Sequence, residues 1–109
     1  MKKVTLFISP AENQPGRHLV VVNGQGFFES VGKTIGARIR GEDEWFDDKL
    51  FSIGSIGIER VLPDGSFSLS KTVSNSQLNE DWGQDEIYAL VDVQGLSGTF
   101  RSNTVTGNF

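Results

Sequence analysis

Short segments in which apolar and polar residues alternate, separated by turn residues, run through most of this chain. Residues 4–8 and 35–39 each place an aliphatic side chain at every second position. A period of two residues is typical of a β-strand with one buried face. No window of eleven or more residues keeps the apolar period of 3.6 residues that an amphipathic helix requires. The pattern therefore predicts an all-β protein.

Turn residues divide the chain into about seven strands. Residues 19–22 form a continuous apolar run, which predicts a central strand that is buried on both faces or crowded within the core. The strongest turn is Pro63-Asp64-Gly65, because proline presets φ, aspartate caps the turn and glycine takes the left-handed position. This turn predicts a hairpin over residues 58–73.

The number of strands depends on Gly54-Ser55, which separates the strand-like residues 50–53 and 56–62. The sequence yields seven strands if these two segments are one broken strand, and eight if Gly54-Ser55 is a hairpin. We favour the broken strand, because residues 50–53 are barely long enough to cross a sheet at about 3.3 Å per residue.

The predicted core takes inward-facing side chains from most of the strands. It consists of Leu6, Val20 or its neighbours Leu19 and Val21, Ile39, Phe67, Leu69, Tyr88, Leu90 and Phe100.

The opening of the chain has a distinctive order of strands and breakers. Ser9-Pro10 closes the first strand and Pro15-Gly16 precedes the second. That strand runs into Asn23-Gly24-Gln25-Gly26 and then Phe27-Phe28. Proline lacks a backbone donor and glycine tolerates positive φ, so both pairs mark strand ends. This order resembles the opening of IPT/TIG and related bacterial immunoglobulin-like domains.

Two later segments extend this resemblance. Asp64-Gly65-Ser66-Phe67 is similar to the D-G-x-F hairpin common in bacterial immunoglobulin-like domains. Residues 87–92, Gly95 and residues 101–105 are similar to their closing pair of strands. The resemblance implies an immunoglobulin-like β-sandwich of about seven antiparallel strands, formed by one domain over residues 1–109. It brings no catalytic residue, and residues 41–58 depart from the pattern.

Composition excludes several classes of function. The chain has 10 basic and 14 acidic side chains and a net charge of −4, which argues against a nucleic-acid partner because phosphates require clustered Lys and Arg. The absence of cysteine excludes disulfides and thiolate metal sites. No apolar run approaches the roughly 20 residues of a membrane span, and residues 4–8 are too short for the apolar part of a signal peptide.

Motifs for catalysis are weak. His18 is the single histidine, so a zinc pair is not expected and a position at the rim of a strand is favoured. Gly32-Lys33-Thr34 ends like a phosphate-binding loop, but a strand rather than a helix follows it. No serine lies in a Gly-x-Ser-x-Gly setting. We therefore expect no enzyme.

The most distinctive feature is a pair of acidic segments that each carry a tryptophan. They contain nine of the fourteen acids, namely Glu42, Asp43, Glu44, Asp47, Asp48, Glu80, Asp81, Asp85 and Glu86. One interpretation is two solvated loops whose tryptophans cover the end of the sandwich. A second is a calcium site with ligands from Asp43, Asp47, Asp48, Asp81 and Asp85, although the spacing is not that of an EF-hand. A third is sugar or peptide binding by Trp45, Phe46 and Trp82.

The function favoured by the sequence is a non-catalytic module. We expect a spacer or an adhesion unit of a larger bacterial surface or phage structural protein, at the cell surface or on a virion rather than in the cytoplasm. Its partners would be neighbouring domains of the parent protein or another protein. The alternative is a carbohydrate-binding module, and calcium is the one cofactor considered. Counting strands predicts that both acidic segments lie at the same end of the sandwich.

Overall fold

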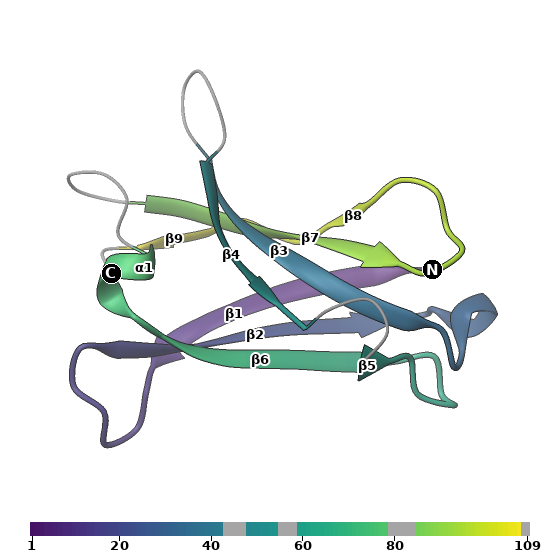
Figure 1. The fold of residues 1–109 in the computed structure, drawn as a ribbon, viewed down its shortest axis with the longest axis horizontal. Helices are drawn as coiled ribbons and strands as arrows, with labels where there is room; N and C mark the ends of the chain where they lie inside the picture. The colour runs from purple at the N-terminus through teal and green to yellow at the C-terminus, as the bar shows by residue number, and fades with distance from the viewer. Residues whose placement is uncertain (43–47, 55–58, 79–84, 108–109) are drawn as a thin grey trace.

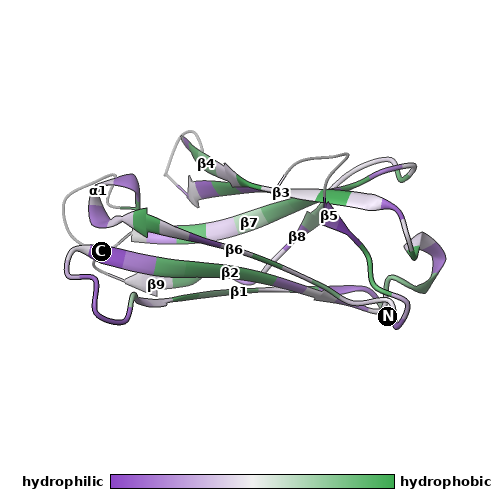
Figure 2. Cartoon of the chain, turned by 60° about the horizontal axis from the view of Figure 1, so that its bottom comes forward, coloured by the Kyte–Doolittle hydropathy of each residue, from purple (hydrophilic) through white to green (hydrophobic). Residues whose placement is uncertain are grey.

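Two antiparallel sheets pack face to face, as the period-two pattern predicts (Figure 2). The computed structural model describes residues 1–42, 48–54, 59–78 and 85–107. The first sheet contains three strands in the order β1-β2-β6, with β1 (Lys3–Pro10), β2 (Arg17–Gln25) and β6 (Phe67–Ser74). The class predicted from the sequence, an all-β sandwich, is confirmed.

The second sheet has a path in the order β4-β3-β7-β8, while β5 also pairs with β3 and β9 with β7 (Figure 1). Its strands are β3 (Thr34–Glu42), β4 (Asp48–Ile53), β5 (Glu59–Arg60), β7 (Asp85–Val93), β8 (Phe100–Arg101) and β9 (Val105–Gly107). Two short helices complete the described ranges, η1 (Phe28–Ser30) and α1 (Asn75–Leu78). Within those ranges, no helix has the length and apolar character needed to cross a membrane.

Both β4 and β5 lie antiparallel to the same strand, β3. Strand β4 pairs with residues 37–41 of β3, and β5 pairs with Thr34 and Ile35 further along it. The two segments thus follow one another along a single neighbour. The described parts of this range, residues 50–54 and 59–62, therefore agree with the prediction of one broken strand rather than a hairpin.

The turn around Gly65 is confirmed, but the hairpin predicted for residues 58–73 is wrong. Gly65 has a φ of +80°, and the Asp64 carboxylate accepts hydrogen bonds from the Ser66 amide and hydroxyl at 3.0 and 2.6 Å. These two bonds lower the pKa of Asp64. However, β5 before the turn pairs with β3, whereas β6 after it pairs with β2. The turn therefore carries the chain from one sheet to the other.

The core lies between the two sheets, and most of its predicted members are confirmed. Five of them are almost completely buried, namely Leu6, Val20, Ile39, Phe67 and Leu69. Phe27 is fully buried at the centre, with its ring centroid 5.2 Å from those of Phe67 and Phe100. Phe100 is half-buried and packs against the core. Aromatic pairs at this spacing add stability beyond the area that they bury.

Two core predictions for β7 are wrong, because the strand faces the core with its other side. The inward residues are Ile87, Ala89, Val91 and Val93. Tyr88 is buried on the outer face, where the Arg101 guanidinium carbon lies 3.7 Å from the ring centroid. Leu90 is half-buried on that same outer face. An inward Tyr88 would also bring Asp92 inward, since the two residues share one phase of the strand.

Strand β2 is the central strand of its sheet, but it is not buried on both faces. Val20 and Val22 are fully buried, whereas Leu19 is 36% exposed and Val21 is half-buried. The apolar run at residues 19–22 therefore supplies the core with every second side chain only. The sheet leaves the other two side chains on its outer surface.

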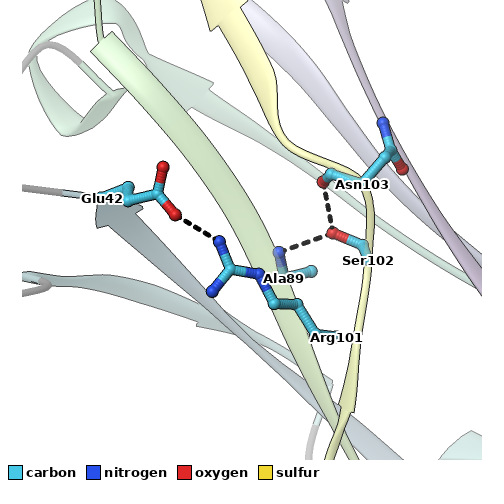
Figure 3. Close-up of polar contacts among 5 residues, drawn as sticks. All are labelled: Glu42, Ala89, Arg101, Ser102 and Asn103. Atoms are coloured by element: carbon cyan, nitrogen blue, oxygen red, sulfur yellow. Dashed lines mark hydrogen bonds and ion pairs between the residues drawn. The ribbon is translucent and has the colours of Figure 1, made fainter.

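A bulge between β8 and β9 joins the two sheets (Figure 3). Three residues, 102–104, lie opposite two residues of β7, because Arg101 pairs with Leu90 and Val105 with Ile87. The Ala89 amide donates to the Ser102 hydroxyl at 2.8 Å, which donates in turn to the Asn103 carbonyl. Bulges of this kind redirect a side chain.

The side chain redirected here is that of Asn103, which pairs with the edge of β1. Its amide oxygen accepts a hydrogen bond from the Leu6 amide at 2.7 Å, and its amide nitrogen donates to the Leu6 carbonyl at 3.2 Å. One side chain of the second sheet thus satisfies both backbone groups of a residue in the first sheet.

Candidate functional site

Most of the predicted site lies outside the described residues. This is true of Asp43, Asp47 and Asp81 in the calcium prediction, and of Trp45, Phe46 and Trp82 in the aromatic prediction. For Asp48 and Asp85 only the backbone is described, at the first positions of β4 and β7. In the part of the chain that is described, no group of three or more metal-ligating side chains gathers. The calcium site stays a prediction.

The residues that flank the two acidic segments do lie together. Glu42, at the end of β3, is the register partner of Glu86 in β7. Strand β4 begins beside Gly41, so its first residue lies at the same end of the sheet. The described residues next to the two acidic segments therefore lie at one end of the sandwich. This agrees with the prediction, made by counting strands, that both segments lie at the same end.

Glu42 and Glu86 form a pair of like charges across β3 and β7 that one arginine partly neutralises. The Arg101 side chain makes an ion pair with Glu42 (Figure 3), and its guanidinium carbon lies over the Tyr88 ring. A hydrogen bond to Glu42, together with the repulsion between the two carboxylates, raises the pKa of Glu86. Glu86 therefore holds its proton more tightly than an isolated glutamate does.

The outward side chains of β3, β7 and β8 form what we call the charged face. It consists of Arg38, Arg40, Glu42, Glu86, Tyr88, Leu90, Asp92 and Arg101. Charged side chains of this face pair with one another across strands. The Arg38 guanidinium donates two hydrogen bonds, of 3.0 and 3.1 Å, to the Asp92 carboxylate. Such two-pronged pairs hold their geometry better than single contacts do. Most charged groups of this face therefore already have a partner within the molecule.

The outward side chains of the first sheet form what we call the neutral face. The strand register arranges them in three rows across β1, β2 and β6, namely Thr5-Asn23-Ser68, Phe7-Val21-Ser70 and Ser9-Leu19-Thr72. None of the nine side chains carries a charge. The surface is hollowed along the first row, where Thr5, Phe7, Asn23, Gly24 and Gln25 line a volume of about 190 Å³.

Sequence reasoning missed both faces as candidate sites. The alternation of Thr5 and Phe7 with Val4 and Leu6 shows which side chains point outward from β1. It does not show which residues of other strands lie beside them, because register depends on pairings that the sequence does not state. An exposed phenylalanine in the middle of a strand is the one signal that the sequence offered.

Comparisons with protein-family models, with curated proteins and with solved structures gave no match to this chain. The case for a function therefore depends on the fold and on the two outer faces.

Proposed function

We propose that this chain is a non-catalytic immunoglobulin-like module that acts as a spacer or an adhesion unit within a larger bacterial surface or phage structural protein. The arrangement of the strands supports the immunoglobulin-like part of the proposal. The strands divide between the sheets as β1-β2-β6 and β4-β3-β7-β8, with β5 beside β3 and β9 beside β7. This division is similar to that of immunoglobulin sandwiches, in which the first, second, fourth and fifth strands share one sheet and the third, sixth and seventh the other. The difference is the fourth strand, here β4 together with β5, which lies in the second sheet beside β3.

The observation that carries the spacer role is the position of the chain ends. Strand β1 begins toward one end of the longest axis and β9, the last described strand, lies toward the other end, and both views agree (Figures 1 and 2). A domain entered at one end and left at the other lengthens the protein that contains it. This geometry favours end-to-end stacking of modules over folding back.

The spacer role can be tested by joining two copies through a short Gly/Ser linker and measuring X-ray scattering. The longest dimension of one copy is 41 Å, and a second copy placed end to end should lengthen the particle by about that amount. The single copy is the control. If the joined pair stays as compact as two copies lying side by side, the spacer role is wrong.

Carbohydrate binding by the tryptophan-bearing segments is the second candidate function. It is favoured by the shared end of the two segments, since Glu42 and Glu86 are register partners. Trp45 and Trp82 are the two tryptophans of the chain, so fluorescence excited at wavelengths that Tyr88 does not absorb reports on them alone. Rapid quenching by acrylamide, relieved by a bound sugar, is the expected result. Slow quenching without sugar would show buried rings and contradict this candidate.

A further inference from the structure

The neutral face stands out because charged residues make up 22% of the chain, yet none lies in its three rows. Charges appear only beyond the rows, at Lys3 on one side and Arg17 on the other. Six of the nine side chains carry a hydroxyl or an amide, and three are apolar, namely Phe7, Leu19 and Val21. A surface with this composition presents hydrogen-bonding groups without an electrostatic preference.

Phe7 is the prominent apolar group of this face. It is 52% exposed, although it lies in the middle of an eight-residue strand. Its register partner Val21 is half-buried and supports the ring from the next strand. A strand holds its side chains roughly perpendicular to the sheet, so the ring stands out from the surface beside the hollow that it lines. Exposed aromatic rings on rigid elements provide stacking surfaces for apolar faces of ligands.

The hollow beside Phe7 carries polar groups that the protein leaves available. The Asn23 amide oxygen accepts a hydrogen bond from the Ser68 hydroxyl at 2.7 Å, which fixes the orientation of the amide. Among the described residues, the Asn23 amide nitrogen, the Thr5 hydroxyl and the Gln25 amide make no side-chain hydrogen bond. The three residues that carry these groups line the same hollow of about 190 Å³. Donors and acceptors therefore surround one aromatic ring.

We propose that the neutral face binds a neutral glycan, with one sugar ring in the hollow beside Phe7. A pyranose has an apolar face of C–H groups, which fits an aromatic ring, and a rim of hydroxyls, which fits amide and hydroxyl partners. It carries no charge, and neither does this face. The hollow is smaller than the roughly 300–1,000 Å³ of pockets for drug-sized ligands, so a single ring is the group that it accommodates.

This site goes beyond the spacer role and does not depend on it. It also differs from the tryptophan-bearing segments, because it lies on the strands of the first sheet. A protein partner fits the face less well, since hydroxyl groups surround the three apolar side chains, whereas the centres of protein interfaces are more apolar.

The test is native affinity electrophoresis of the full chain in gels that contain a neutral soluble polysaccharide. The panel consists of laminarin, xyloglucan, galactomannan and yeast mannan. We expect at least one of them to retard the protein. Phe7→Ala should weaken that retardation about tenfold, because an aromatic contact and its buried area contribute around one decade of affinity. Asn23→Ala should weaken it in the same direction.

Phe28→Ala is the matched control, since Phe28 is 69% exposed but lies outside the neutral face. It should leave retardation unchanged. Melting curves of all three variants verify that each is folded. Failure of every polysaccharide to retard the protein would overturn the proposal. So would retardation that survives Phe7→Ala but is lost in Trp45→Ala or Trp82→Ala. Self-association in sedimentation that Phe7→Ala abolishes, without glycan binding, would assign the face to a second copy instead.

Discussion

Phe7 and Tyr88 lie on opposite outer faces of the same sandwich, and their rings differ in exposure to solvent. Tyr88 is 3% exposed, because Arg101 lies over its ring and reaches on to Glu42. Phe7 is 52% exposed and no charged side chain covers it. The charged face forms pairs among its own groups, whereas the neutral face keeps its ring and several polar groups available to solvent.

This difference shows what determines whether an outward side chain is available for a ligand. In both sheets every second side chain points outward, so the backbone geometry does not distinguish the two faces. On the charged face, long arginine side chains span neighbouring strands and cover the surface between them. On the neutral face the partners are short, serine and threonine above all, and cannot cover a phenylalanine. The length of the neighbouring side chains leaves one face closed and the other open.

The largest expected effect tests the phase of alternation that defines both faces. Phe67→Ala removes an inward ring that is 3% exposed and should lower the free energy of unfolding by about 3–5 kcal/mol. Its outward neighbour Ser68 is exposed, and Ser68→Ala should cost about 0.5 kcal/mol or less. Urea unfolding measures both. A similar loss in the two variants would mean that inner and outer faces of β6 are assigned wrongly.

A smaller effect is expected where the sheet of the charged face is joined to the sheet of the neutral face. Asn103→Ala removes the two hydrogen bonds to Leu6 and should cost about 1–2 kcal/mol, at roughly 1 kcal/mol for each bond. The adjacent Thr104 is exposed, so Thr104→Ala is the control and should be close to neutral. Hydrogen exchange should also speed up at the Leu6 amide. Unchanged exchange there would contradict the pairing.

The alternation could be predicted for some strands from the sequence and not for others, and β1 and β7 show why. In β1 the two phases differ clearly, because Val4 and Leu6 are aliphatic whereas Thr5 is polar. In β7 both phases are apolar, and the larger side chains, Tyr88 and Leu90, suggested the wrong one. The decisive signal was Asp92, a charge on the same phase. A charged residue indicates which face of a strand points outward more reliably than the size of its apolar residues does. The reason is that burying an unpaired charge costs more free energy than exposing an apolar group.

The candidate site depended on pairings that lie beyond local sequence. Thr5 meets Asn23 through strand register, and Leu6 meets Asn103 from the far end of the chain. The acidic segments were predicted from their composition, and their common end followed from counting strands. What composition could not reveal is the role of Arg101, whose ion pair and ring contact depend on its position beside Leu90 of β7.

A modest effect is expected from breaking an ion pair on the charged face. Arg38 and Asp92 are each about two-fifths exposed, with side-chain exposures of 37% and 40%. A double-mutant cycle with Arg38→Met and Asp92→Asn should give a coupling of about 0.2–1 kcal/mol that shrinks with added salt. Coupling that is unaffected by salt would show that the two side chains interact through packing rather than charge.

The smallest effect is a pH dependence of the protein's stability that arises from Glu86 on the charged face. Because its pKa is raised in the folded protein, the fold binds this proton more tightly than the unfolded chain does. Stability should therefore decline as pH rises from the ordinary glutamate pKa through the raised one. Glu86→Gln should remove this decline. Asp64→Asn is a control of opposite sign, since the lowered pKa of Asp64 adds stability that is lost as pH falls. An unchanged pH profile in Glu86→Gln would contradict the pairing with Glu42.

Hydroxyl-radical footprinting read by mass spectrometry tests the contrast between the two faces most directly, because it reports on Phe7 and Tyr88 in one sample. We expect rapid oxidation of Phe7 and strong protection of Tyr88, and Arg101→Ala should make Tyr88 reactive. Phe28, at 69% exposure, provides an internal reference for an open ring. Oxidation of Tyr88 at the rate of Phe28, together with protection of Phe7, would contradict the assignment of an open neutral face and a closed charged one.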